Sequence, residues 1–219
     1  MNKPRLHLDV IVDVVCPWCF LGKRRLDAAM EELPDIDFSI AYRPYQLDPN
    51  LPKAGAERQA YMRGKFPDRN ALDEAHARLT DMGRDVGIAY AFDAIPTVPN
   101  TLDAHRLIRW AQEAQLGDEM VEHLFKLYFE DAADLTQQDV LIAAAETVGL
   151  DEDEVTMKLD DGADVEIVKA DIAHASALGI SGVPCIIVDR KFAISGAQSS
   201  DILVQAFGKI AAELQAAAR

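Results

Sequence analysis

The sequence predicts an α/β fold in which both ends of the 219-residue chain form one sheet around an inserted, all-helical domain. Three observations predict it. The N-terminal end alternates as strand–helix–strand, the middle has helical periodicity without a strand pattern, and the C-terminal end reads as strand–strand–helix. The simplest packing gives one domain from residues 1–55 and 180–219 and a second from residues 56–179.

The N-terminal elements follow from the spacing of apolar residues and from helix breakers. Residues 6–14 read as a buried strand, and residues 17–32 read as an amphipathic helix. Pro34 ends this helix, because a proline cannot continue the backbone hydrogen bonding. Residues 38–42 alternate as a second strand, and a proline-rich connector follows over residues 44–52.

Helical periods fill the middle of the chain. Thr101 and Thr136 resemble helix-capping residues, because an acidic residue follows each within the first turn. The predicted helices cover residues 57–64, 69–86, 101–115, 118–130, 137–148, 151–160 and 162–178. After Gly179, residues 183–188 and 192–195 read as two strands joined by a turn, and a last helix covers residues 199–217.

The composition excludes some classes of function. The formal net charge of −15 argues against nucleic acid and against anionic membrane surfaces, because both attract basic patches. No apolar run approaches the roughly 20 residues of a membrane span. Residues 1–5 lead directly into the first strand without the apolar segment of a secretion signal, so we expect the cytoplasm.

The most informative motif is Cys16-Pro17-Trp18-Cys19, where the first strand passes into a helix. The unpaired N–H groups and the dipole of a helix N-terminus favour the thiolate of Cys16. Cys19 lies one turn later, where its sulfur can close a disulfide with Cys16. Pro17 falls in the first turn, where a missing N–H costs little. In a cytoplasmic chain such a pair is more often catalytic than structural.

The pair has two other interpretations. A structural zinc site usually needs four ligands, yet the third cysteine, Cys185, is distant in sequence and no second pair occurs, so we predict no metal. Two inert buried cysteines are the other interpretation. The Pro-Trp dipeptide at a strand-to-helix junction argues against it and favours redox or thiol-dependent chemistry.

Five segments of the chain, in the same order, resemble the DsbA-like branch of the thioredoxin superfamily and, within it, the FrnE-like oxidoreductases. They are residues 13–19 (DVVCPWC), 42–47 (YRPYQL), 100–107 (NTLDAHRL), 179–184 (GISGVP) and 195–198 (SGAQ). The resemblance covers nearly the whole chain. It implies a thioredoxin-like fold with an inserted all-helical domain.

The resemblance also implies a cis bond between Val183 and Pro184, packed against the disulfide. The open backbone edge at Val183 would then pair with an extended peptide or with glutathione. The alternative is an ordinary proline at the first residue of a strand. Gln198 opens the last helix, where a glutathione carboxylate could bind, although helix capping explains this position equally well.

Four further residues have open roles. Pro17 and Trp18 are expected to tune the reduction potential and to make the pair a weaker oxidant than a C-P-H-C site, although Trp18 could simply pack. Asp13 could replace the buried carboxylate that thioredoxins carry six residues before the first cysteine, but a cap on the first helical turn is the favoured interpretation. The Cys185 side chain is expected to be buried and to serve packing, with a third redox group or a glutathionylation site as the alternative.

The leading hypothesis is a thiol:disulfide oxidoreductase in which Cys16 attacks and Cys19 resolves. Its partners would be disulfide-bearing proteins or glutathione, with no cofactor beyond glutathione as a candidate co-substrate. A glutathione-dependent isomerase or transferase of the 2-hydroxychromene-2-carboxylate isomerase type is the alternative, although such proteins and the related kappa-class glutathione transferases typically carry serine at the position of Cys16. A non-catalytic holdase is a third hypothesis. The oligomeric state is not predicted.

Overall fold

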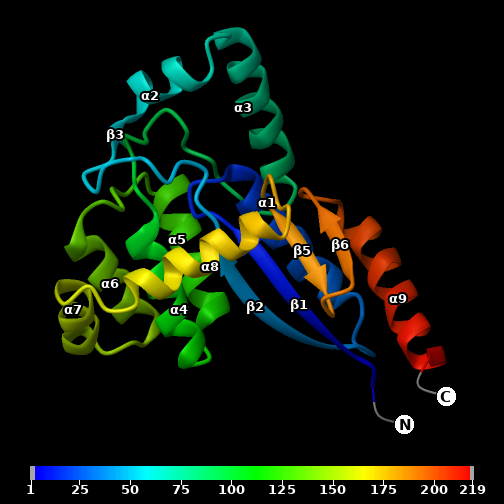
Figure 1. Cartoon of the computed structure of the whole chain (residues 1–219). Coiled ribbons are helices and arrows are strands. Elements are labelled where there is room, and N and C mark those ends of the chain that lie inside the picture. The colour runs from blue at the N-terminus through cyan, green and yellow to red at the C-terminus, as the bar shows by residue number, and fades with distance from the viewer. Residues whose placement is uncertain (1–2, 218–219) are drawn as a thin grey trace.

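The computed structural model describes residues 3–217 and shows a four-stranded sheet made from both ends of the chain (Figure 1). Its strands are β1 (Arg5–Val12), β2 (Asp37–Pro44), β5 (Cys185–Val188) and β6 (Phe192–Ser195), in the order β2-β1-β5-β6. β1 runs parallel to β2 and antiparallel to β5, and β5 and β6 are antiparallel. This arrangement confirms the predicted fold class.

Strand β1 lies at the centre of the sheet, which explains its nearly continuous apolar sequence. Leu8 pairs with Ile40 of β2 on one side and with Val188 of β5 on the other. Both faces of β1 are covered, and its last five residues are all buried. The strand ends at Val12, two residues earlier than predicted, because the chain turns there toward the first helix.

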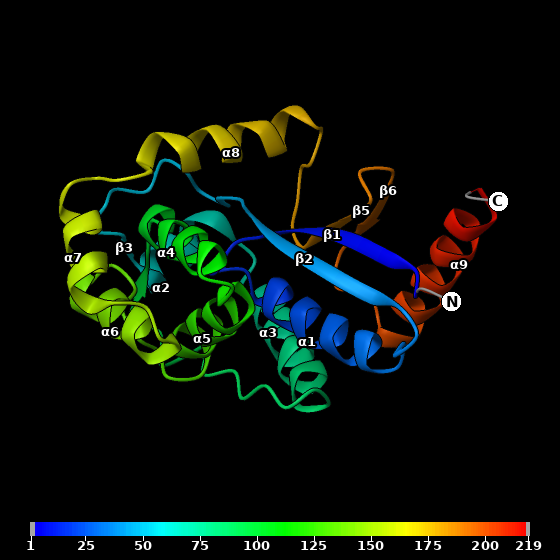
Figure 2. The ribbon, with the colours of Figure 1, turned by 90° about the horizontal axis from the view of Figure 1, so that it is seen from below.

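Helices cover both faces of the sheet (Figure 2). Helix α1 (Pro17–Glu31) and helix α9 (Ser200–Ala217) pack together on one face, and helix α8 (Val165–Ala177) lies on the other face. Helix α8 contacts both β2 and helix α4 (Leu102–Glu113). The last helix of residues 56–179 therefore covers part of the sheet formed by the chain ends.

We call residues 56–179 the insertion. Its other helices agree with the predicted periods to within a few residues. They are α2 (Arg58–Lys65), α3 (Arg69–Arg84), α5 (Gly117–Phe129), α6 (Gln138–Val148) and α7 (Glu152–Asp160). Helices α2 and α3 project above the end of the sheet at which β1 leads into α1 (Figure 1). No helix within the described residues is long and apolar enough to cross a membrane.

The expectation of an all-helical insertion was wrong in one detail. Strand β3 (Ala56–Glu57) pairs antiparallel with strand β4 (Thr97–Val98). Two-residue strands are too short to show alternation, so the sequence pattern could not reveal them. Gly55 permits the pairing, because a Cβ at this position would lie 2.6 Å from the Val98 carbonyl oxygen and φ is +70°.

A buried lysine joins the insertion to the first domain. Lys23 of α1 is 4% exposed, and its Nζ lies 2.8 Å from Asp27 and 3.0 Å from Asp118 of α5. The hydroxyl of Tyr42 in β2 donates to the same Asp118 carboxylate at 2.6 Å. Burial alone would lower the pKa of Lys23, but the facing carboxylates outweigh it and raise that pKa. Three elements are thus held together by one charged cluster.

Candidate active site

The C-x-x-C motif forms the first turn of α1. The residues between β1 and α1 make a turn in which the Cys16 N–H donates to the Asp13 carbonyl at 3.0 Å. Cys16 is the N-cap residue, Pro17 is the first helical residue, and the Cys19 N–H donates to the Cys16 carbonyl at 2.9 Å. We call residues 13–19 the redox turn. Its position at a helix N-terminus is the one predicted from the motif.

The two thiols of the redox turn differ in burial. Both cysteines are free; Cys16 is 4% exposed and Cys19 is fully buried. Burial raises the pKa of Cys19 well above its ordinary value, and the hydrogen bond and charge of Cys16 raise it further. The backbone of Asp13 acts in the opposite direction. Cys19 therefore keeps its proton more firmly than an ordinary thiol does.

The loop before β5 lies against the redox turn. The Cys16 thiol donates to the Val183 carbonyl over 3.6 Å, and the Val183–Pro184 bond is cis, as the resemblance implies. Gly22 of α1 permits this close approach, because a Cβ there would lie 3.0 Å from Cγ of Pro184. The fold thus brings the two ends of the chain together at Cys16.

Gln198 lies after this loop and does not line the space in front of Cys16. Its side-chain amide donates to the Ser195 carbonyl at 2.7 Å, and its backbone N–H donates to the Gly196 carbonyl at 2.9 Å. These bonds stabilise the turn between β6 and α9. A substrate-binding role of Gln198 stays a prediction.

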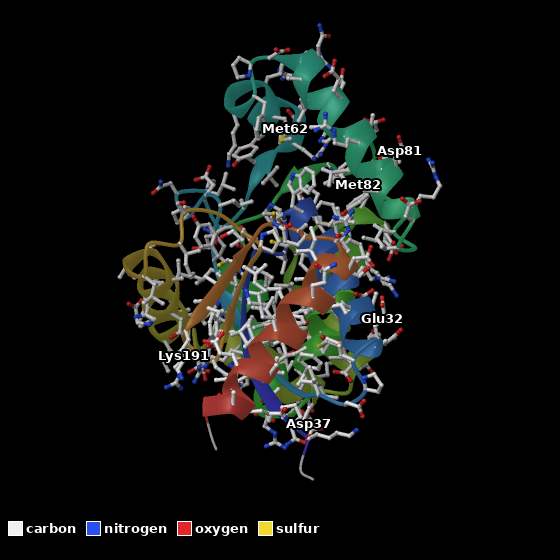
Figure 3. The ribbon with its side chains drawn as sticks, turned by 90° about the vertical axis from the view of Figure 1, so that its right-hand side faces the viewer. Glu32, Asp37, Met62, Asp81, Met82 and Lys191 are labelled. Atoms are coloured by element: carbon white, nitrogen blue, oxygen red, sulfur yellow. The ribbon has the colours of Figure 1, made fainter. Side chains whose placement is uncertain are left out.

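A cavity of about 540 Å³ opens in front of the redox turn, between it and helices α2 and α3 of the insertion. We call it the chamber. Its wall includes Cys16, Trp18 and Val183, together with apolar side chains of the insertion such as Met62 and Leu79. Met62 belongs to α2, and its side chain points toward α3 (Figure 3). Trp18 is 37% exposed, so its ring is partly open to solvent.

Asp13 does not cap the first turn of α1, so the favoured interpretation was wrong. No side chain caps this helix. The Asp13 carboxylate instead faces the connector that follows β2, where Oδ2 accepts a hydrogen bond from the Leu47 N–H at 2.7 Å. Asp13 is 1% exposed, and its Oδ1 has no hydrogen-bond partner. The charge of this carboxylate acts on Cys19 and contributes to the raised pKa of that thiol.

Two residues of the insertion were not predicted for the site. His105 of α4 is buried, with Nε2 2.9 Å from the Tyr45 carbonyl and 3.6 Å from Asp13 Oδ1. Tyr90 donates its hydroxyl to the Pro17 carbonyl at 2.6 Å. Burial, followed by the charges of the two cysteines, raises the pKa of Tyr90. Helical periodicity could place His105 on an inner face, but Tyr90 lies in irregular structure that gives no sequence signal.

Cys185 lies apart from the two other cysteines. It belongs to β5 and packs with Ile11 and Ala175 in a small separate apolar cluster. It is 5% exposed, and burial raises its pKa, partly opposed by a hydrogen bond with Ser195. This placement agrees with buried packing, the expected default.

The chain belongs to the family of DsbA-like thioredoxin domains, whose model matches residues 7–208. This membership confirms the resemblance read from the five sequence segments. The redox turn at the helix N-terminus and the Val183–Pro184 loop that it faces thus belong to a domain of a thioredoxin family.

Solved structures share the fold of this chain. A protein of Streptomyces coelicolor described as a probable DsbA oxidoreductase is 26% identical, with a TM-score of 0.83 over 93% of this chain and 89% of its own. A 2-hydroxychromene-2-carboxylate isomerase is 18% identical, with a TM-score of 0.71 over 95% and 98%. The cytosolic disulfide reductase DsbM from Pseudomonas aeruginosa, solved with GSH, is 18% identical, with a TM-score of 0.62 over 98% and 99%.

Proposed function

We propose that this protein is a thiol:disulfide oxidoreductase that exchanges electrons between the Cys16–Cys19 pair and the disulfides of proteins or small molecules. One observation carries the proposal. Cys16 is the N-cap residue of α1, contacts the Val183 carbonyl and lines an open chamber. Cys19 is fully buried behind it. This division suits an attacking thiol and a resolving thiol.

In the reductive direction, the Cys16 thiolate attacks one sulfur of the substrate disulfide. A bond forms between Cys16 and that sulfur, the substrate S–S bond breaks, and the second substrate sulfur leaves as a thiolate. Cys19 then attacks Cys16. The Cys16–Cys19 bond forms, and the first substrate sulfur leaves with the electron pair of the broken bond, so two electrons pass from the enzyme to the substrate.

Cys19 has to lose a proton before it attacks, and its raised pKa makes this step costly. We assign the proton acceptor as Asp13. Its Oδ1 is buried and unpartnered, and its charge is close enough to oppose ionisation of Cys19. His105 lies 3.6 Å from this oxygen. A positioned carboxylate would shorten the lifetime of the mixed disulfide.

Glutathione is the proposed reductant. One glutathione thiolate attacks the Cys16–Cys19 disulfide, and a second displaces the first as glutathione disulfide, which restores both thiols. The neighbour DsbM, solved with GSH, supports this choice. We propose the cytoplasm as the compartment, because its glutathione pool keeps such a pair reduced.

An isomerase or transferase is the second candidate, favoured by the apolar chamber and by the fold shared with 2-hydroxychromene-2-carboxylate isomerase. In an isomerase or transferase reaction, glutathione takes part without being oxidised to glutathione disulfide. The two candidates therefore differ in whether glutathione disulfide accumulates during turnover.

The test is reduction of hydroxyethyl disulfide and of insulin by glutathione, with glutathione disulfide measured as product. We expect turnover with the wild-type protein and none with Cys16→Ser. Cys185→Ser is the matched control, since Cys185 lies in a separate cluster, and it should retain activity. Turnover by Cys16→Ser, or an inactive wild-type protein, would contradict the proposal.

A further inference from the structure

The chamber has the dimensions of a small-molecule site. Its volume of about 540 Å³ lies within the range of roughly 300–1,000 Å³ that is usual for such pockets. Cys16 forms part of the wall, so a sulfur that reacts with it would bring its substituent into this space. A folded protein surface cannot enter such a cavity, whereas a compact group attached to sulfur can.

The two cations in the chamber wall donate hydrogen bonds to neutral groups of the wall. The Arg58 guanidinium donates to the Phe92 carbonyl at 2.7 Å and lies 5.9 Å from the Phe92 ring centre. The Lys65 ammonium donates to the Tyr61 hydroxyl at 2.7 Å and lies 5.1 Å from that ring. Three acidic residues line the chamber as well, Asp13, Asp48 and Asp68. The wall therefore offers no excess of positive charge to a ligand with several anionic groups. The wall therefore favours an apolar occupant over a charged one.

Part of the chamber wall is aromatic and held in place by stacking. His76 stacks on Phe92 with ring centres 4.2 Å apart, and Phe92 stacks on Tyr90 at 4.7 Å. The rings in each pair are inclined by 10° or less. Tyr90 is fixed in turn by its bond to Pro17 in the redox turn. A wall made of stacked rings suits a flat apolar group.

We propose that the preferred substrates are small mixed disulfides in which one sulfur carries a compact aromatic arm. This inference rests on the proposed oxidoreductase function and names its substrate class. The arm fills the chamber while its sulfur bonds to Cys16, and the other half of the disulfide leaves as a thiolate. Cys19 then displaces the aromatic thiol, and two glutathione molecules reduce the Cys16–Cys19 disulfide, becoming glutathione disulfide.

The test compares mixed disulfides of glutathione with ethanethiol, benzyl mercaptan and 2-naphthylmethanethiol. Glutathione is the reductant, and release of each thiol is followed by chromatography. We expect kcat/KM to rise by at least about tenfold from the ethyl to the naphthylmethyl substrate, because one buried methylene can already change discrimination by roughly that factor. Equal values for the three substrates would overturn the inference and leave the proposed function intact.

Filling the chamber should remove this preference. Ala75 of α3 lines the chamber, so Ala75→Phe should lower the ratio of kcat/KM for the naphthylmethyl substrate to that for the ethyl substrate at least about tenfold. Ala77→Phe is the matched control, because Ala77 is exposed on the same helix and outside the wall. If Ala75→Phe misfolds by circular dichroism, Ala71→Phe, at an exposed wall position, replaces it.

The outcomes separate the two proposals. Loss of the preference in the filled variant alone supports the chamber as the site of the aromatic arm. An equal effect of the filled and control variants overturns that assignment. Failure of the wild-type protein to reduce any disulfide, hydroxyethyl disulfide included, overturns the proposed function and the inference together.

Discussion

At the scale of single residues, Cys16 and Cys19 have unequal access to substrate. Cys16 lines the chamber, whereas Cys19 is fully buried behind it. Cys19→Ser should therefore accumulate a mixed disulfide with substrate or glutathione at Cys16, because no second thiol is present to release it. Mass spectrometry of the intact protein would show the adduct. Cys16→Ser should carry none, and an adduct on Cys19 in that variant would reverse the assignment.

Asp13 should affect the release step and leave capture nearly unchanged. In Asp13→Asn, we expect release of substrate from Cys16 to slow by roughly 10- to 100-fold, within the lower range for a lost proton acceptor. Stopped-flow kinetics with a fluorescent disulfide separates the two steps. Asp48→Asn is the matched control, since Asp48 lines the same chamber and contacts the Asn50 N–H instead.

The pH dependence of release follows from Cys19. Its raised pKa means that the thiol is protonated at neutral pH. In Asp13→Asn no internal group accepts the proton, so the Cys19 thiol has to ionise before it attacks. The rate of release in this variant should therefore rise about tenfold per pH unit up to the pKa of Cys19. The wild-type rate should rise less steeply. Parallel profiles for the two proteins would remove Asp13 from the mechanism.

Tyr90 should influence the redox equilibrium through the Pro17 carbonyl. The structure shows this hydrogen bond with both cysteines as thiols. Tyr90→Phe removes it and keeps the ring, so the equilibrium with glutathione should move toward the Cys16–Cys19 disulfide. A net hydrogen bond of about 0.5–1.5 kcal/mol corresponds to a shift of roughly 2- to 12-fold.

The control for Tyr90 is Tyr128→Phe. The Tyr128 hydroxyl donates to the Thr97 carbonyl at 3.2 Å, in the same aromatic cluster, and makes no hydrogen bond to the redox turn. This variant should lose comparable stability without moving the redox equilibrium. An equal shift in both variants, or a shift of the Tyr90 variant toward the thiols, would contradict the prediction.

At the scale of elements, the Lys23 cluster holds α1, β2 and α5 together. Removing one partner of a buried ion pair costs about 3–5 kcal/mol. We expect Lys23→Met to cost about 2 kcal/mol, because the Asp118 side chain is 50% exposed and water screens its charge. Urea unfolding at pH 8 measures this loss in the free energy of unfolding. Lys126→Met should cost less than about 0.5 kcal/mol, because Lys126 makes an exposed 3.5 Å pair with Glu122.

The same cluster predicts a loss of stability at alkaline pH. The facing carboxylates raise the pKa of Lys23, so its stabilising effect is complete below its ordinary value and is lost as pH rises through the higher folded-state value. Burial raises the pKa of Tyr42 in the same direction. The free energy of unfolding should therefore fall as pH rises above about 10, and less so in Lys23→Met. Identical profiles would exclude Lys23 as a source of this loss.

The helices and the redox turn show which parts of the structure can be predicted from the sequence. Long periodic segments such as α3 and α9 were predicted to within two residues, since a helix of four turns displays its buried face several times. The redox turn was predicted because it is local in sequence. The partners of Asp13 and Pro17 were not, because His105 and Tyr90 reach the turn only after the insertion has packed onto it.

At the scale of the whole molecule, the candidate active site is assembled from segments that lie far apart in the sequence. The first domain supplies the redox turn and the Val183–Pro184 loop, and the insertion supplies most of the chamber wall. Composition and periodicity locate each part along the chain. They do not give the distance between the parts, which depends on side-chain packing such as the stack of Phe20 on Phe125 at 5.2 Å.

The pairing of β1 with β5 has a consequence for synthesis of the chain. Cys16 and Cys19 leave the ribosome about 165 residues before Pro184, which is roughly 10–30 s at ordinary elongation rates. During that interval one edge of β1 lacks its partner, and Val183 is absent from beside Cys16. The nascent protein thus carries both thiols of the redox turn before it carries the carbonyl group that Cys16 contacts in the folded chain.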